Sequence, residues 1–379
     1  EIQTKSGQNK MKKVIFALIF VLLTFTGCYN YADVEDVVVV AGMAFDKNEN
    51  GYSVVAETIA PGSSSEASVK SETVFSEGKT VFEAMEGLKN ASGKPFDFSH
   101  CQVIFVGEKT AENGISEILD MVFHYNTLRL TVLFVTVGGG LSSTVFDCEL
   151  PLYDIVSYGI FDMMKQDNPG SAVYPSAQAY ACLNTLENKG KDLILPRLSI
   201  NDKEIFYSGM TVFRDDRAVG NISSETARRY LTLMGKLAGG DMTLSVGGEY
   251  VSFEIRDIST ESRIETYPAA FETKVKIKAA ARQLPENCDL SDPKCKEYLQ
   301  QETERVIEEE LSETFDEIKR NFRSDVFAFG NMIYRKMPSE WENIKDGWRD
   351  VFSTASLEIV CECEIIDSGR TPQNAVSGR

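Results

Sequence analysis

Five residues between positions 46 and 57 have the spacing of a calcium-binding loop: Asp46, Asn48, Asn50, Gly51 and Glu57. Oxygen ligands at loop positions 1, 3, 5 and 12 and a glycine at 6 define the EF-hand, which needs a helix on each side. Here both flanks, 37–45 and 52–60, are rich in β-branched residues. We therefore expect a hairpin turn at this position, with calcium binding as the lesser alternative.

The other patterns that could support catalysis are incomplete. Gly78-Lys79-Thr80 matches only the end of a nucleotide-binding P-loop, because Thr73 stands where its first glycine belongs. The two histidines, His100 and His124, form no zinc-protease motif, and no serine lies in a nucleophile elbow. We expect no enzyme activity and no cofactor. A glycosidase-type pair of carboxylates stays open, because the sequence does not show which acids meet.

Two pairs of cysteines could form covalent or metal sites. Cys361 and Cys363 alternate on an expected strand and so share one face, where buried thiols are a better explanation than a metal site. Cys288 and Cys295 lie in a polar loop. Either a small disulfide loop or two free thiols is compatible with their spacing. We predict no metal site.

The N-terminal segment predicts export from the cytoplasm. Lys12 and Lys13 precede the uncharged apolar run 14–26. As a helix this run is roughly 20 Å long, short for a bilayer core of about 30 Å but suited to a signal peptide. Phe25-Thr26-Gly27-Cys28 resembles a bacterial lipobox, so we expect removal of residues 1–27 and lipidation of Cys28. A plain signal peptide or an inserted anchor, with Cys28 incidental, is the alternative.

Composition excludes several classes of partner. The 379 residues carry 57 Asp and Glu against 39 Lys and Arg, a net charge of −18. Such a chain is unsuited to nucleic acid or to anionic lipid headgroups, which need clustered basic residues. We expect no nucleic-acid partner. Hydrophobic residues make up 43%, enough for a folded chain with two or three domains.

The pattern along residues 28–145 predicts an N-terminal α+β domain. After the hairpin, helices are expected at 80–90 and 115–123, and strands at 103–106 and 131–137. The stretch 146–204 begins with a helical pattern, becomes irregular around Pro169 and Pro175, and is predicted to be a small middle domain.

Residues 205–379 are predicted to form a C-terminal α+β domain. It begins with a hairpin at 205–219 and a helix capped by Ser223 or Ser224. Strands at 250–258, 262–267 and 270–279 precede a long helix, 294–323, then a helix at 341–352 and a last strand at 356–366. The long helix has an apolar stripe, and its acids are expected to form a solvated face. A coiled coil with a partner is the alternative. Each domain is expected to be a largely antiparallel sheet packed with helices.

Residues spread over the mature chain resemble the C subunits of spore germinant receptors. Near the start these are Cys28-Tyr29, Glu35-Asp36 and the strand ending Gly42-Met43-Ala44-Phe45-Asp46, although Tyr29 stands where the family usually has Trp. The C-terminal half matches better, and its matching residues are Gly209 to Phe213, Val219-Gly220, Ser224-Glu225-Thr226, Ser324 to Gly330, Tyr334 to Pro338, Trp341, Trp348, Phe352 and Gly369. We expect the Trp, Phe and Gly residues among them to be core and turn positions.

The resemblance implies a lipid-anchored subunit with three mixed α/β domains on the outer face of the spore inner membrane. Acyl chains on Cys28 would hold it there, beside two integral membrane subunits, the A-type and the B-type. The family has no known catalytic residues, so none is assigned, and ligand-binding residues are unknown. The alternative is a lipid-anchored solute-binding protein or one that acts on the cell wall.

Overall fold

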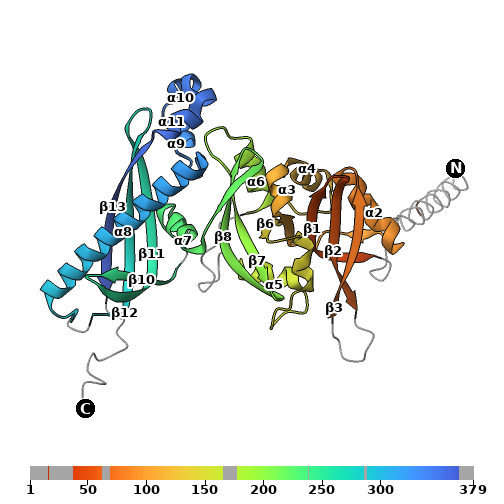
Figure 1. The fold of residues 1–379 in the computed structure, drawn as a ribbon, viewed down its shortest axis with the longest axis horizontal. Helices are drawn as coiled ribbons and strands as arrows, with labels where there is room; N and C mark the ends of the chain where they lie inside the picture. Colours follow the sequence, from red (N-terminus) through yellow and green to blue (C-terminus); the bar gives the residue numbers. More distant parts are fainter. Residues whose placement is uncertain are drawn as a thin grey trace, which may run out of the picture. The chain divides into compact units, whose positions relative to one another are not determined.

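A computed structural model describes residues 16, 37–61, 69–164, 177–237, 239–285 and 288–366. The chain divides into two compact units, Glu1–Val37 and Val38–Arg379. Cys28 lies outside the described residues. Figure 1 shows two sheets in the second unit, one formed by its N-terminal part and one by its C-terminal part.

The larger sheet has nine strands, in the order β3-β2-β1-β5-β6-β7-β8-β9, with β4 beside β1. Their bounds are β1 (Val38–Asn48), β2 (Gly51–Pro61), β3 (Val69–Gly78), β4 (Phe96–Asp97), β5 (Val103–Gly107), β6 (Leu133–Gly138), β7 (Ile194–Asn201), β8 (Glu204–Arg214) and β9 (Arg217–Ile222). The central strands β1, β5, β6 and β7 run parallel, and the outer pairs are antiparallel. The predicted hairpin is β1–β2, closed where Asn48 pairs with Gly51.

Helices cover both faces of this sheet. One core includes residues of α2 (Val81–Ser92), α3 (Glu108–Asn113), α4 (Ser116–His124) and α6 (Ala179–Leu186). The opposite core is built under the 3₁₀ helix η2 (Ser142–Asp147) and α5 (Val156–Met163). Strand β5 contributes alternate residues to the two cores, so all five of its residues are buried.

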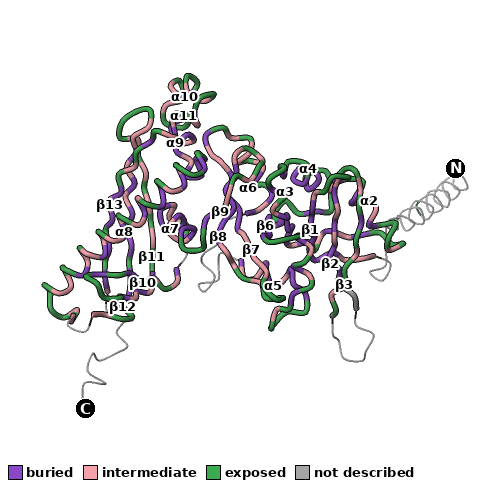
Figure 2. Tube along the Cα trace, in the orientation of Figure 1, coloured by how far each residue is buried: buried purple, intermediate pink, exposed green. Residues whose placement is uncertain are grey.

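The smaller sheet has the order β10-β11-β12-β13, with β13 parallel to β12. Its strands are β10 (Gly240–Val246), β11 (Glu249–Thr266), β12 (Ala270–Gln283) and β13 (Ser356–Ile366). Helices α7 (Ser224–Leu233) and α8 (Pro293–Phe322) pack on one face. The other face is polar, and Figure 2 shows the resulting alternation of buried and exposed residues along the strands. The remaining elements are α9 (Phe329–Lys336), α10 (Pro338–Ile344), η3 (Lys345–Gly347) and α11 (Trp348–Ser353).

Several predictions are confirmed and others are wrong. The α+β class is confirmed, as are the long helix α8 and the cap, where Ser223 Oγ accepts from Thr226 N. The two strands predicted at 250–258 and 262–267 are the single bulged strand β11. The helix predicted at 341–352 is divided into α10, η3 and α11. The hairpin at 205–219 pairs with β7, so it belongs to the larger sheet. The division into three domains stays a prediction.

The acids of α8 only partly form the predicted solvated face. The apolar stripe is buried, but Glu308 Oε1 accepts a hydrogen bond from Cys361 N at 2.8 Å, and Glu304 Oε1 accepts from Cys363 N at 2.8 Å. Both N–H groups belong to β13, an edge strand. Helix α8 therefore covers the face of the smaller sheet and also accepts hydrogen bonds from two N–H groups at its outer edge.

Candidate functional site

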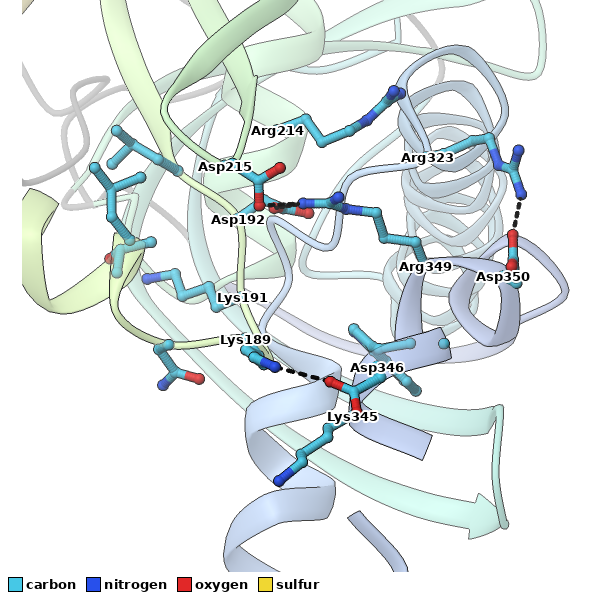
Figure 3. Close-up of a pocket in the computed structure, with 16 residues that line it drawn as sticks. Lys189, Lys191, Asp192, Arg214, Asp215, Arg323, Lys345, Asp346, Arg349 and Asp350 are labelled. Carbon is cyan, nitrogen blue, oxygen red and sulfur yellow. Dashed lines mark hydrogen bonds and ion pairs between the residues drawn. The ribbon is translucent and has the colours of Figure 1, made fainter. Parts of the chain in front are cut away.

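A charged cleft lies where the segment 185–193, the β8–β9 turn, the end of α8 and residues 345–350 meet (Figure 3). Its volume is about 470 Å³. The segment 185–193 leads into β7 of the larger sheet, whereas α8 and residues 345–350 pack with the smaller sheet. The cleft is therefore built by both sheets, and any movement between them would change it.

Most charges of the cleft are paired across it. Lys189 Nζ lies 2.8 Å from Asp346 Oδ1, and Arg349 Nη2 lies 2.5 Å from Asp215 Oδ1. Arg349 also lies 3.9 Å from Asp192. Such partly exposed pairs contribute little to stability but orient the side chains. The cleft therefore has the features of a polar interface.

Hydrogen bonds join the two sheets beneath the cleft. Asp192 N donates to Asp325 O at 2.9 Å, and Asp325 N donates to Asp192 Oδ2 at 2.7 Å. Asn331 N donates to Gly190 O at 2.8 Å. A Cβ on Gly190 would lie 2.5 Å from Asn331 N, so only glycine permits this approach. This contact holds the segment 190–192 against the start of α9.

The carboxylate of Asp325 organises that start. It accepts hydrogen bonds from Phe329 N at 3.1 Å, Gly330 N at 2.8 Å and Trp348 Nε1 at 3.0 Å. Burial raises the pKa of Asp325 to about 7, against these donors, which lower it. Burial also raises the pKa of Asp192. Both oxygens of the Asp325 carboxylate accept hydrogen bonds from within the protein, which indicates a structural carboxylate rather than a catalytic acid.

Two basic side chains of the cleft, Lys191 and Arg214, have fewer hydrogen-bond partners than the others. Burial lowers the pKa of Lys191, whose ammonium has no hydrogen bond or ion pair among the described residues. Arg214 Nη2 donates to Phe322 O at 2.6 Å, but its Nε is buried with no acceptor in the described part of the chain. The described residues of the lining include no serine, cysteine or histidine.

The residues that have the spacing of a calcium loop do not come together, as expected for a hairpin turn. Asp46 accepts from Ser142 N and Oγ at the start of η2. Glu57, fully buried, accepts from Val156 N at 2.8 Å and Ser157 N at 2.9 Å at the start of α5. Both carboxylates therefore cap helices. In the described ranges no three His, Cys, Asp or Glu residues lie close enough to hold a metal.

The cysteines that the structure describes are buried or form a disulfide. Cys288 and Cys295 form a disulfide with a Cα–Cα distance of 5.7 Å, which settles the alternative left open by their spacing. Cys361 and Cys363 are buried on one face of β13, and burial raises the pKa of Cys363 to about 12. His124 Nδ1 bonds to Asp120 O, and His100 is exposed. Within the described ranges, every helix is too short or too polar to cross a membrane.

Two family models match the chain. Residues 30–200 match the spore germination protein N-terminal domain, and residues 208–369 match the spore germination B3/GerAC-like C-terminal domain. The chain belongs to this family of spore germination proteins. The family is one of germinant receptor C-type subunits, so the resemblance found in the sequence is confirmed.

Individual relatives cover nearly the whole of this germination protein. Spore germination protein B3 of Bacillus subtilis (strain 168) is 24% identical over 369 residues, which cover 93% of this chain and 96% of B3. Spore germination protein KC of the same organism is 22% identical and covers 95% of this chain and 97% of KC. The crystal structure of the GerBC protein has a TM-score of 0.58 at 19% identity, covering 86% of this chain and 97% of GerBC. That likeness shows the fold.

The buried carboxylates were missed by sequence reasoning. Asp192 and Asp325 lie far apart in the sequence, and each stands in an unremarkable polar context. Trp348 and Gly330, which the family resemblance includes, do surround Asp325. Gly330 and Trp348 are therefore core positions, as the resemblance led us to expect. Asp325, which also belongs to the resembling residues, is a buried carboxylate at the base of the cleft.

Proposed function

We propose that this protein is a lipid-anchored, non-enzymatic subunit of a nutrient germinant receptor in the spore inner membrane. The observation that carries the proposal is the match of two germination domains over residues 30–200 and 208–369, directly after the lipobox that ends at Cys28. Diacylglyceryl and acyl chains on Cys28 would hold the chain on the extracytoplasmic face. Its partners would be the two integral subunits of the A-type and B-type.

Physical chemistry explains why the anchor would matter. Removal of residues 1–27, which carry four Lys and one Glu, would change the net charge from −18 to −21. Such a body is repelled by anionic headgroups, so apolar chains must supply the membrane affinity. Each buried methylene contributes about 0.8 kcal/mol, and two chains give a stable anchor where one is marginal. Confinement to the membrane surface then raises the effective concentration of the protein for its membrane partners.

Affinity purification of the tagged protein from detergent-solubilised membranes of dormant spores tests the proposal. We expect both integral subunits to be recovered, and we expect Cys28→Ala to leave the membrane fraction and to abolish the germination response. Thr26→Ala, which keeps a small residue in the lipobox, is the matched control and should behave as wild type. A Cys28→Ala protein that stays membrane-bound and active would refute the lipid anchor.

The alternative function is a lipid-anchored solute-binding protein or one that acts on the cell wall. Recovery of a transport permease instead of the integral subunits would favour solute binding. Recovery of the protein only from vegetative membranes would also contradict the receptor proposal.

A further inference from the structure

The larger sheet ends in a strand with an open edge. Strand β3 pairs with β2 along its whole length, from Tyr52↔Gly78 to Pro61↔Val69. No strand in the part of the chain that the structure describes pairs with its other side. An open edge of this length presents backbone donors and acceptors to any extended segment that approaches it.

The sheet face beside this edge is also incompletely covered. Helices η2 and α5 lie over the central strands, whereas Phe75 on β3 is 56% exposed. Val55, on the neighbouring β2, is only half-buried. In the loop before α5, Leu152 is 89% exposed. Apolar side chains are therefore available near an edge whose backbone can still form hydrogen bonds.

An open groove of about 810 Å³ runs beside β3. It is lined by residues 71–73 of β3 and by residues between positions 146 and 156, and no Lys, Arg or His is among the described residues of this lining. Three carboxylates line it, those of Asp147, Glu149 and Asp154. All three residues are exposed, and within the described ranges none of these carboxylates has an ion pair or a hydrogen bond. Glu72 pairs with Thr58 of β2, so its side chain points to the opposite face of the sheet.

The charged cleft makes an instructive contrast. There Asp215, Asp346 and Asp350 each lie within 3 Å of a basic side chain of the same chain. In the β3 groove the acids form no ion pair with any described residue, so the field of the groove favours a cation from outside. A partner that is both extended and basic would satisfy the backbone edge and the carboxylates together.

We propose that β3 and its acidic groove form a docking site for an extended, lysine- or arginine-bearing segment of a partner protein. The segment adds a strand to the sheet through main-chain hydrogen bonds, and alternate basic side chains reach the carboxylates. This inference rests on the proposed function only in requiring a protein partner. It does not depend on the lipid anchor.

Peptide binding to the full chain in non-ionic detergent tests the docking site. The probe is a fluorescent peptide of alternating Lys and Val residues, measured by anisotropy. Two control peptides carry Glu in place of Lys, or N-methyl groups on alternate backbone nitrogens. The protein variant is Glu149→Lys with Asp154→Lys. Its matched control is Asp257→Lys with Glu261→Lys, two exposed acids on β11 of the smaller sheet.

We expect the Lys–Val peptide to bind, with an affinity that falls as salt is raised. The groove variant should weaken binding at least tenfold, the control variant less than threefold, and N-methylation should abolish it. Equal binding of the N-methylated peptide, or equal loss in the two variants, would overturn the docking site. If the integral subunits are recovered from spores but the Lys–Val peptide does not bind, the receptor function stands and only the β3 docking site is rejected.

Discussion

Strand β5 of the larger sheet is packed on both faces, whereas strand β12 of the smaller sheet is packed on one face, and their residue patterns differ accordingly. All five residues of β5 are buried, because Ile104 and Val106 face one core while Val103 and Phe105 face the other. In β12 only alternate residues are buried from Phe271 to Ile277. A strand covered on both faces must be apolar throughout, whereas a strand with one solvated face alternates. The local pattern therefore reports how many layers surround a strand.

The largest expected effect comes from truncating side chains on these two strands. In β5, Ile104→Ala should destabilise by about 2–5 kcal/mol and Phe105→Ala by about 3–5 kcal/mol, although the two residues point to opposite faces. In β12, Ile277→Ala should cost about 2–5 kcal/mol, whereas Lys276→Ala should change stability by less than about 0.5 kcal/mol. Guanidinium denaturation followed by far-UV circular dichroism measures these differences. A mild effect at either β5 position would contradict coverage of both faces.

Local patterns allowed much of the fold to be predicted. The hairpin β1–β2, helix α2, strand β5 and helix α8 each have a periodicity or a cap within a few residues. Long-range pairing was not predictable in the same way. The hairpin that contains β8 was placed in the predicted C-terminal domain, 205–379, whereas β8 pairs with β7 in the larger sheet. Glu57 was interpreted through its spacing from Asp46, whereas its hydrogen-bond donors come from residues 156 and 157.

The candidate site shows the same limit. The lipobox at Cys28 is a short motif and the family resemblance is a pattern of many spaced residues, so both could be inferred from the sequence. The cleft brings together segments around residues 190, 214, 323 and 348, and no local pattern connects them. Buried carboxylates such as Asp325 are invisible in the sequence because an aspartate in a polar context is usually exposed.

A second prediction concerns the junction of the two sheets. The folded-state pKa of Asp325, raised by burial from 3.8 to about 7, means that the folded protein binds this proton more tightly than the unfolded chain. The contribution of Asp325 to the free energy of unfolding therefore falls as pH rises from about 4 to 7. Asp325→Asn should remove that fall. The free energy of unfolding of the wild type minus that of the variant, measured by denaturation from about pH 4 to 7, should therefore decrease as pH rises.

Two comparisons make the measurement specific. Asp192 also has a pKa raised by burial, and its charge raises the pKa of Asp325, so the difference reports the titration of Asp325 together with its coupling to Asp192. Asp257→Asn, at an exposed position of β11, is the matched control and should give no pH-dependent difference. If the difference in unfolding free energy between the wild type and Asp325→Asn does not change with pH, the carboxylate is not held in a desolvated environment.

The smallest predicted effect concerns the two outer edges, β3 and β13. Four residues of helix rise about 6 Å and two residues of strand span about 6.6 Å, so Glu304 and Glu308 match Cys363 and Cys361 in spacing. Each carboxylate accepts one edge N–H at 2.8 Å. Charge-assisted bonds are roughly twice as strong as neutral ones, so Glu304→Gln and Glu308→Gln should each cost about 1 kcal/mol in the free energy of unfolding, measured by guanidinium denaturation.

Glu313→Gln, at an exposed position on the same helix, is the control and should be neutral. A loss in the control equal to that in either variant would attribute the effect to helix charge rather than to the edge. If the edge explanation holds, the double variant should also bind the Lys–Val peptide no better than wild type, because Glu362 and Glu364 of β13 are already paired with Lys274 and Lys278 of β12. Strand β3 would then differ from β13 in leaving its edge open beside unpaired acids, which is what a docking strand requires.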